Sequence, residues 1–213
     1  MDIIAENSRM QIRREVLGPY GTNLYIVICR ETGDSVIIDA PATPKVIAES
    51  VEGSVPRYLL LTHNHMDHTG ALARLKSMYR IPLAVHELDA SGLPVAPDIL
   101  LNDGDEVTFG NLSIRVMHLP GHTPGSLGFL IGKYLISGDT LFPGGPGATG
   151  SPESFRQILT TITGKLYALP DATVVLPGHG ESTMIGTSKS EYAVFAAGEH
   201  GTDLCGDVLW KTS

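Results

Sequence analysis

The stretch LTHNHMDHTG at residues 61–70 places three histidines and one aspartate within six positions of a chain that has only eight histidines. In an extended segment, side chains two residues apart point to the same side, so His63 and His65 can bind one ion together. Asp67 and His68 follow where we expect the chain to turn into a helix, which would direct them toward a second position. The stretch therefore predicts a metal site that needs further ligands from elsewhere in the sequence.

Three further segments also place a histidine or an aspartate after an apolar, strand-like run: IRVMHLPGHT at 114–123, YLISGDT at 134–140 and TVVLPGHG at 173–180. Sites are commonly assembled where strands end at one rim of a sheet, so we expect all four segments to converge. They would supply five imidazoles and two carboxylates, enough for two metal ions with three or four ligands each. The candidate ligands are His63, His65, Asp67, His68, His122, Asp139 and His179.

The chemistry of these ligands limits the metal. No cysteine lies near the four segments, so the ligand atoms are nitrogen and oxygen only. Such a set is compatible with zinc, iron or manganese, and we expect two divalent ions, with zinc preferred. Asp139, alone in its loop, suits a carboxylate that bridges two cations and offsets part of their repulsion. His86, His118 and His200 belong to no motif and are interpreted as surface or supporting residues.

The composition is that of one globular domain spanning residues 1–213, with 42% hydrophobic and 18% charged residues. The net charge of −8 disfavours a nucleic-acid partner, because such binding requires a basic surface. The N-terminus lacks the pattern of a signal peptide, and no apolar run is long enough for a membrane span. Cys29 lies in an apolar run and Cys205 far from it, so we expect reduced thiols and a cytoplasmic protein.

Apolar runs and turn residues predict strands mixed with helices, without a linker or a repeat. Helices are predicted at 44–51, 69–79 and 154–166. Thr43 and Ser154 are the expected N-caps of the first and last of these helices. Strands are predicted at 24–29, 36–39, 58–61, 82–86, 107–109, 112–117, 127–131, 134–137, 173–176 and 192–196. This order indicates α/β or α+β layers, with sheets packed between helices.

Five short segments of the chain together resemble the motifs of a known family. THNHMDH resembles the HxHxDH signature of the metallo-β-lactamase fold superfamily. GHTPGS at 121–126, SGDTLF at 137–142 and PGHG at 177–180 are similar to its later motifs, in the same order. VIIDAP at 36–41 resembles its early strand motif, whose aspartate, here Asp39, supports the metal ligands from behind.

The resemblance implies a four-layer αβ/βα sandwich with a dinuclear site between the sheets. It also implies how the ligands divide: His63, His65 and His122 for one metal, and Asp67, His68 and His179 for the other, with Asp139 bridging. β-Lactamases of this superfamily usually have a cysteine where Asp139 stands, which argues against antibiotic hydrolysis as the native activity.

GDTLFPGGPG at 138–147 and LPDATVVLPGHG at 169–180 resemble the glyoxalase II-like hydrolases, the hydroxyacylglutathione hydrolases. Two departures concern glutathione. Ala148 and Gly150 stand where that family usually has a basic residue and a tyrosine that contact glutathione. The roughly thirty residues after PGHG do not resemble its C-terminal helical domain either. The glycine-rich stretch 143–150 is expected to be either a loop beside the metals or a tight surface crossing.

The expected activity is metal-dependent hydrolysis of a thioester or related small ester, with Asp67 orienting the attacking water and Asp139 joining the two metals. Alternatives are a single-iron dioxygenase acting on a sulfur compound such as a persulfide, a lactonase or another ester hydrolase of the same fold. A nuclease is disfavoured by the acidic composition, and a non-catalytic binding protein by the complete ligand set. The expected partner is a small molecule, and the oligomeric state stays open.

Overall fold

The strand β3 (Thr22–Cys29) illustrates how the sequence builds layers, since it is buried along its whole length. Its side chains alternate between two cores, as the geometry of a strand requires. Leu24 and Ile26 pack toward the helices on one side, whereas Tyr25 and Val27 face the second sheet. A strand that is apolar on both faces must lie between two covering layers. The computed structural model, which describes residues 1–210, has this arrangement.

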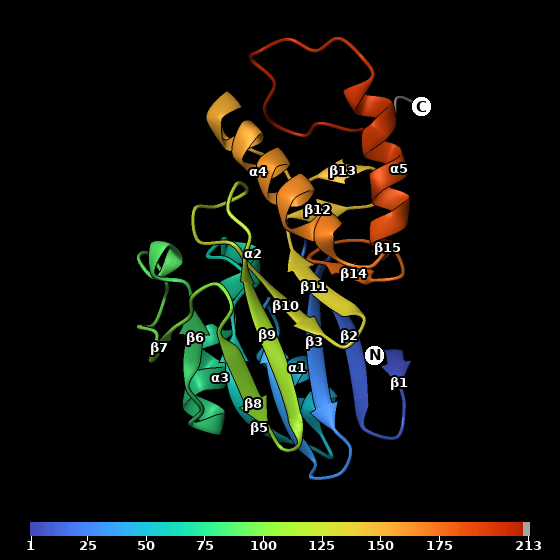
Figure 1. Cartoon of the computed structure of the whole chain (residues 1–213). Helices are drawn as coiled ribbons and strands as arrows, with labels where there is room; N and C mark the ends of the chain where they lie inside the picture. The colour runs from blue at the N-terminus through green and yellow to red at the C-terminus, as the bar shows by residue number, and fades with distance from the viewer. Residues whose placement is uncertain (211–213) are drawn as a thin grey trace.

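The two main sheets follow the order of the sequence almost without interruption (Figure 1). The first has the order β1-β2-β3-β4-β5-β6-β7, with β1 (Asp2–Glu6), β2 (Met10–Leu17), β4 (Asp34–Ile38), β5 (Val55–Leu60), β6 (Leu83–Val85) and β7 (Ile99–Leu100) beside β3. The second has the order β15-β14-β11-β10-β9-β8, comprising β8 (Glu106–Phe109), β9 (Leu112–His118), β10 (Leu127–Ile131), β11 (Tyr134–Gly138), β14 (Val174–Pro177) and β15 (Thr183–Met184). A small hairpin pairs β12 (Leu141–Phe142) with β13 (Gly145–Pro146).

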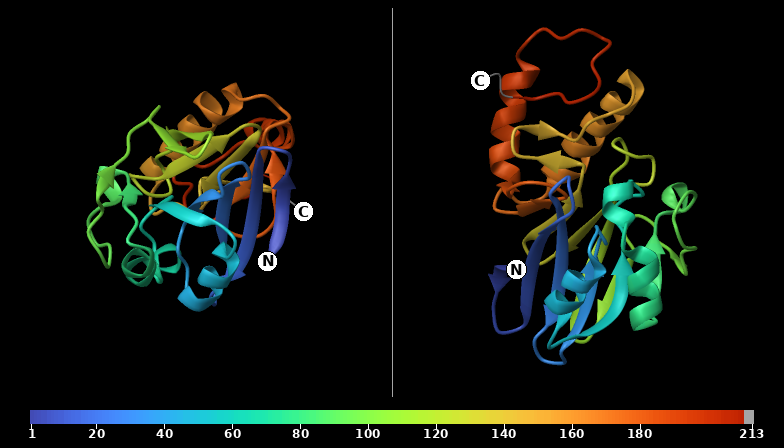
Figure 2. Two further views of the ribbon diagram at one scale, coloured as in Figure 1. Left: turned by 90° about the horizontal axis from the view of Figure 1, so that it is seen from below. Right: turned by 180° about the vertical axis from the view of Figure 1, so that it is seen from behind.

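Helices cover the outer faces of both sheets. The first sheet carries α1 (Pro44–Val51), α2 (Met66–Thr69) and α3 (Leu72–Tyr79), and the second carries α4 (Pro152–Gly164) and α5 (Ile185–Ala196). Figure 2 shows α4 and α5 on the opposite side of the sheets from α1 and α3. The buried residues divide into one core between the sheets and one beneath each helical layer. The predicted four-layer αβ/βα sandwich is therefore confirmed.

Several local predictions differ from the structure at the helix ends. The helix α1 has the predicted bounds and the predicted proline in its first turn, but Thr43 has φ 72° and makes no side-chain cap. The cap of α4 is Ser151, whose side chain accepts a hydrogen bond from Ser154 N at 3.1 Å. The helix predicted at 69–79 is interrupted, and a separate turn of helix, α2, already contains Asp67 and His68.

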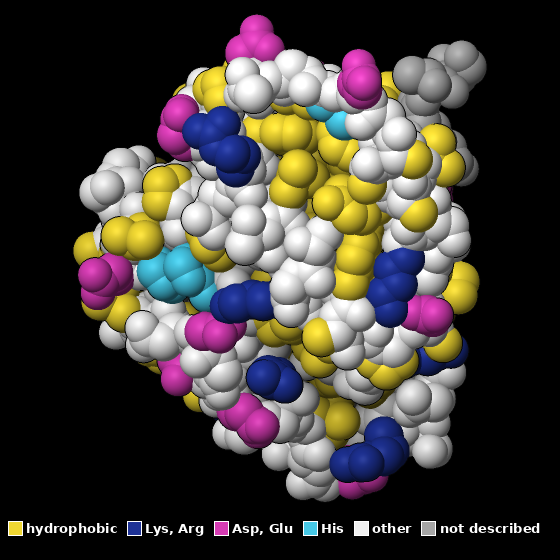
Figure 3. All heavy atoms as spheres, turned by 45° about the horizontal axis from the view of Figure 1, so that its top comes forward, with side chains coloured by type: hydrophobic (Ala, Val, Ile, Leu, Met, Phe, Trp, Pro, Cys, Tyr) yellow, Lys and Arg dark blue, Asp and Glu magenta, His cyan; other side chains and the backbone are white. Residues whose placement is uncertain are grey.

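The largest difference lies in the tail, where residues 192–196 were predicted as a strand but belong to the helix α5. The strands β1 and β2 were not predicted at all. Cys29 is buried and Cys205 exposed, and neither is bonded to the other, as expected for free thiols. No helix within residues 1–210 is both long and apolar enough to cross a membrane. Figure 3 shows apolar side chains gathered in a hollow between α4 and α5, with a volume of about 250 Å³.

Candidate metal centre

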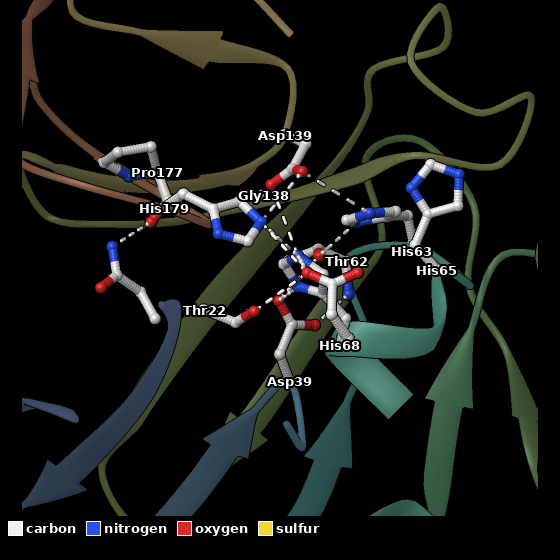
Figure 4. A network of polar contacts seen from close by, with 12 residues as sticks. Thr22, Asp39, Thr62, His63, His65, His68, Gly138, Asp139, Pro177 and His179 are labelled. Atoms are coloured by element: carbon white, nitrogen blue, oxygen red, sulfur yellow. Dashed lines mark hydrogen bonds and ion pairs between the residues drawn. The ribbon is translucent and has the colours of Figure 1, made fainter. Parts of the chain in front are cut away.

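All seven predicted ligands come together where the strands of both sheets end. His63 and His65 follow β5, and the turn of helix α2 then presents Asp67 and His68. Each of the other three ligands follows a strand of the second sheet: His122 after β9, Asp139 after β11 and His179 after β14. Figure 4 shows the side chains from the two sheets pointing toward one another across the gap between them.

The ligand atoms form three groups of three, of which His63, His68 and Asp139 make up one that shares a histidine with each of the other two. In the first group, the atoms of His63, His65 and His122 all lie within 4.8 Å of one another. The Nδ1 atom of His65 is 2.9 Å from Nε2 of His122. The second group, with the same spacing limit of 4.8 Å, consists of Asp67, His68 and His179. These two groups are the ligand sets that the resemblance implies.

Asp139 lies between the two groups. Its Oδ2 is 3.6 Å from Nε2 of His122, in the first group, and 3.4 Å from Nε2 of His179, in the second. Its Oδ1 is 3.5 Å from Nε2 of His68. Two ligand atoms bound at about 2.0–2.1 Å to one tetrahedral metal are about 3.4 Å apart, so these spacings suit a shared ligand.

Hydrogen bonds on the far side of the rings direct Nε2 of three histidines into the centre. Nδ1 of His122 donates to the carbonyl of Ala148 at 2.7 Å, and Nδ1 of His179 donates to the carbonyl of Tyr20 at 3.1 Å. Carbonyl oxygens can only accept, so the proton stays on Nδ1 and the lone pair of Nε2 is left for a metal. Nδ1 of His68 is likewise 2.8 Å from a carboxylate oxygen of Asp39.

Asp39 orients a second histidine through Thr62. The Thr62 hydroxyl donates to Oδ2 of Asp39 at 2.8 Å and lies 3.0 Å from Nδ1 of His63. Because that hydroxyl proton is given to Asp39, its oxygen accepts from Nδ1 of His63, and Nε2 of His63 again faces the centre. Asp39 adopts φ 64°, a left-handed conformation that aspartate tolerates better than most residues. The supporting role that the resemblance implies for Asp39 therefore has a geometric basis.

Two buried atoms indicate that the centre fits a metal. Within the described residues, Nε2 of His63 and Oδ1 of Asp139 are buried without a hydrogen-bond partner. An unpaired buried polar atom costs about 1–3 kcal/mol, and both are atoms that coordinate metals well. A cation placed among them would satisfy both. The donor set of imidazole nitrogens and carboxylate oxygens suits a divalent ion such as zinc, iron or manganese.

The pKa values of these groups reflect their mutual proximity. Burial, followed by the neighbouring His68, holds the pKa of His63 well below its usual range. Burial also lowers the pKa of His68, but the carboxylate of Asp39 outweighs it and raises that pKa to about 9. Burial raises the pKa of Asp139, yet the hydrogen bond with His179 and the surrounding imidazoles hold it well below its ordinary value. Asp139 is thus an anion at neutral pH.

Sequence reasoning missed two residues that position the ligands. Thr22, at the start of β3, donates its hydroxyl proton to Oδ2 of Asp67 at 2.9 Å. Asp89, fully buried, accepts from the backbone of Asn64 at 3.2 Å and from the hydroxyl of Thr123 at 2.7 Å, and so joins two ligand-bearing loops. Neither residue belongs to a motif, so no local signal in the sequence distinguishes it.

The remaining histidines lie outside the two groups of ligands, as predicted. The rings of His86 and His118 stack with their centroids 4.0 Å apart. His200 stacks on Phe195 in the tail, at a centroid distance of 3.8 Å. The glycine-rich stretch 143–150 lies beside the centre, because its residues share a cavity with three of the ligands.

Changing Asp39 to asparagine is expected to weaken metal binding about 10- to 100-fold, a typical effect of removing a carboxylate that holds a metal-binding histidine. The asparagine keeps a similar shape but loses the charge that faces His68. Competition with a chromogenic chelator measures the affinity. An unchanged affinity would mean that Asp39 does not organise the centre. Asp105→Asn, which alters an aspartate in a turn beside Asn102, is the matched control.

The family assignment follows from comparison with known proteins. The family model described as Metallo-beta-lactamase superfamily matches residues 17–179. The chain belongs to the metallo-beta-lactamase superfamily. A hydroxyacylglutathione hydrolase of Photorhabdus laumondii subsp. laumondii is 35% identical over 159 residues, which cover 74% of this chain and 62% of that relative. The chain therefore leaves more than a third of that relative unmatched.

Two solved structures resemble the chain over most of its length. The structure of BLEG-1 B3 metallo-beta-lactamase has a TM-score of 0.75 at 29% identity and covers 84% of this chain and 96% of that one. The structure of TTHA1623 in a di-iron-bound form has a TM-score of 0.72 at 33% identity, with 83% and 96% covered. This member of the metallo-beta-lactamase superfamily is accordingly a metallohydrolase by family, with a histidine and aspartate cluster that fits a metal site.

Proposed function

We propose that this protein is a dinuclear metal-dependent hydrolase of small thioesters. The observation that carries the proposal is the position of Asp139, whose carboxylate groups with His63 and His68 and also lies close to His122 and His179. The two groups without Asp139 would hold one ion each. We expect zinc at both positions, with iron as the principal rival because TTHA1623 binds two iron ions.

Two bound cations would supply an acidified water molecule as nucleophile and polarise the substrate carbonyl. The protein's part is to hold its groups rigidly around the reacting atoms. Asp67 is fixed by Thr22, and its Oδ2 is 3.2 Å from Nε2 of His179. We expect this carboxylate to accept a hydrogen bond from the attacking water and to orient it. Asp139 remains charged and keeps the two groups of ligands together.

The ionised state of Asp139 limits which leaving groups the centre can release. The low pKa of Asp139 prevents that carboxyl group from donating a proton. A thiol has a pKa of about 8.5, so it departs as a thiolate without a proton donor. The alcohol of an ester and the amine of an amide are much weaker acids and need a proton to depart. This difference supports a thioester as the substrate. The likeness to a hydroxyacylglutathione hydrolase points the same way.

Thiol release from metal-quantified protein tests the proposal. We expect turnover of at least one thioester in a panel that includes S-lactoylglutathione, with activity lost on chelation and restored by metal. Absence of turnover across the panel at two metals per chain would contradict the proposal. The likeness to BLEG-1 makes a β-lactam the necessary comparison substrate, and faster cleavage of the β-lactam would also contradict it.

A single-iron dioxygenase would behave differently in the same preparation. It would saturate with one iron per chain and consume oxygen when given a persulfide. The second group of ligands, Asp67, His68 and His179, supports a second ion instead. We therefore expect no oxygen consumption, measured with an oxygen electrode.

Metal binding is expected to release a proton from His68. The pKa of His68 is raised to about 9 in the metal-free protein, so its ring is protonated at neutral pH and must lose that proton to bind a cation. Affinity at this position should rise about tenfold per pH unit until pH 9 and then level off. Calorimetric titrations in buffers of different ionisation enthalpy measure the release. In the Asp39→Asn variant the released fraction should fall, because the group that raises the pKa is gone. Equal release from both proteins would contradict this assignment.

A further inference from the structure

Two cavities share His122 in their linings. The first has a volume of about 390 Å³ and a mixed lining, in which Leu88 and two prolines accompany His118, Glu153 and Gln157. The second has a volume of about 290 Å³ and is lined by His122, Asp139 and His179 themselves. A carbonyl at the centre has two substituents that point apart. A substrate that occupied both cavities would place one half in each.

Part of the wall of the second cavity comes from the C-terminal segment 206–210, here called the tail, through Asp207, Val208 and Leu209. We call this second cavity the tail pocket. Its opposite wall comes from the β12–β13 hairpin and includes Phe142 and Pro146. Val208 and Leu209 thus face a cavity that three candidate metal ligands share.

Contacts on both sides fix the tail against the hairpin. Gly206 and Thr149 exchange two backbone hydrogen bonds, at 2.8 and 3.2 Å. The backbone N–H of Trp210 donates to the carbonyl of Gly144 at 2.7 Å, and its side chain is only 2% exposed. A side chain on Gly145 would lie 2.7 Å from the carbonyl oxygen of Val208, so the two backbones are in close contact. The wall of the tail pocket is therefore built into the fold.

The chemistry of the tail pocket away from the ligands is apolar and acidic. Val208 and Leu209, the latter 67% exposed, give the C-terminal wall of the pocket its apolar side chains. Asp207 is the charged side chain that the tail adds to the lining. Among the described residues, no lysine or arginine lines either cavity. A carboxylate in the tail pocket would meet another carboxylate and an apolar wall.

Cations near the first cavity are already paired. Arg156 binds Glu153 at 2.7 Å, and Lys165 binds Asp103 at 3.0 Å. Glutathione carries two carboxylates, and within residues 1–210 neither cavity is lined by a lysine or an arginine that could bind them.

We infer that the substrate is a thioester without charge on either side of the scissile bond, and that its short apolar half occupies the tail pocket. This inference rests on the proposed thioester hydrolysis and deepens it. The volume of about 290 Å³ lies at the lower end of the range for small-molecule sites, which favours a short chain. Asp207 and Leu209 would act as specificity-determining residues.

Matched thioesters test the inference on the metal-loaded protein. Butyryl-N-acetylcysteamine is uncharged, butyrylglutathione adds charge to the thiol half, and succinyl-N-acetylcysteamine adds charge to the acyl half. We expect kcat/KM to be about tenfold or more higher for the uncharged compound than for either charged one. Equal or better turnover of a charged compound would overturn the inference but leave the hydrolase intact.

Variants of the tail locate the effect. Asp207→Lys should raise kcat/KM for one of the two charged thioesters, relative to the uncharged one, by about fivefold or more, because it replaces a repulsion by an attraction. The compound that responds identifies which half occupies the tail pocket. Leu209→Asp should raise KM for the uncharged thioester. Leu100→Ala, at an exposed leucine on β7, is the matched control and should change neither ratio. No response to Asp207→Lys or Leu209→Asp would overturn the inference.

Binding of an inert thioether separates this inference from the proposed function. S-butyl-N-acetylcysteamine cannot be hydrolysed, and calorimetry measures its affinity directly. Binding that weakens in Leu209→Asp but not in Leu100→Ala supports the tail pocket even if no thioester is cleaved. Binding that is the same in all three proteins, or tighter for S-butylglutathione, would overturn it.

Discussion

Replacement of Asp139 by alanine is expected to remove bound metal and to lower kcat/KM for a thioester by about a thousandfold or more. Asp139 provides the negative charge between the two groups of ligands, with Oδ2 close to both His122 and His179. Without it, two cations in the centre would repel each other and each would lose a ligand. The expected result is a protein that retains at most one metal per chain.

Elemental analysis together with a thiol-release assay measures both effects in one preparation. His200→Ala is the control, because His200 stacks on Phe195 and lies outside the ligand groups. That variant should keep its metals and its activity. Full activity and two metals in Asp139→Ala would refute the arrangement of ligands proposed for this protein.

The second large effect is expected for Gly178→Ala, a change of one methyl group. A side chain at Gly178 would collide with Oδ1 of Asp139 and would lie 2.7 Å from Cε1 of His68. Gly178 is held in place by a hydrogen bond from its N–H to the carbonyl of Gly138 at 2.9 Å. The ligands must therefore move, and a displacement of about 1 Å in a catalytic group can cost about a hundredfold in rate.

Gly150→Ala is the matched control for this substitution. Gly150 lies in the loop beside the centre, but a side chain there meets nothing within 4 Å. Both variants should keep the far-UV circular dichroism of the parent, and only Gly178→Ala should lose metal and activity. Equal activity of the two variants would mean that the close approach of Gly178 to Asp139 and His68 has no consequence.

The sequence allowed the strand ends to be recognised because each ligand follows a run of apolar residues. Strands such as β3 and β11 are buried on both faces, so they appear in the sequence as continuous apolar segments. β2 was missed for the opposite reason. It contains Arg13, Arg14 and Glu15, and its pattern of burial is mixed.

The helix α5 was misread because polar residues occupy its buried face. Its buried positions are Ile185, Ser188 and Glu191, spaced as a helix requires, but only one of them is apolar. The structure explains the other two. Ser188 makes hydrogen bonds with Tyr167, and Glu191 accepts from the backbone N–H of Gly144 at 3.0 Å. Such partners lie far apart in sequence, so no local periodicity could indicate them.

The candidate ligands were predictable, but the walls of the substrate site were not. The tail is held by backbone hydrogen bonds at Gly206 and by the burial of a single side chain, Trp210. Backbone pairing of this kind depends on which segments meet in the folded chain and leaves no motif. The contribution of Asp207 and Leu209 to the cavity beside the metals became apparent only from the folded structure.

The most direct test of the central proposal is a titration of metal into the metal-free protein, with thioester turnover measured at each step. Two groups of ligands that share Asp139 predict that activity rises until two equivalents are bound per chain and then stays constant. Saturation of activity at one equivalent, or activity that does not depend on metal, would contradict a dinuclear hydrolase.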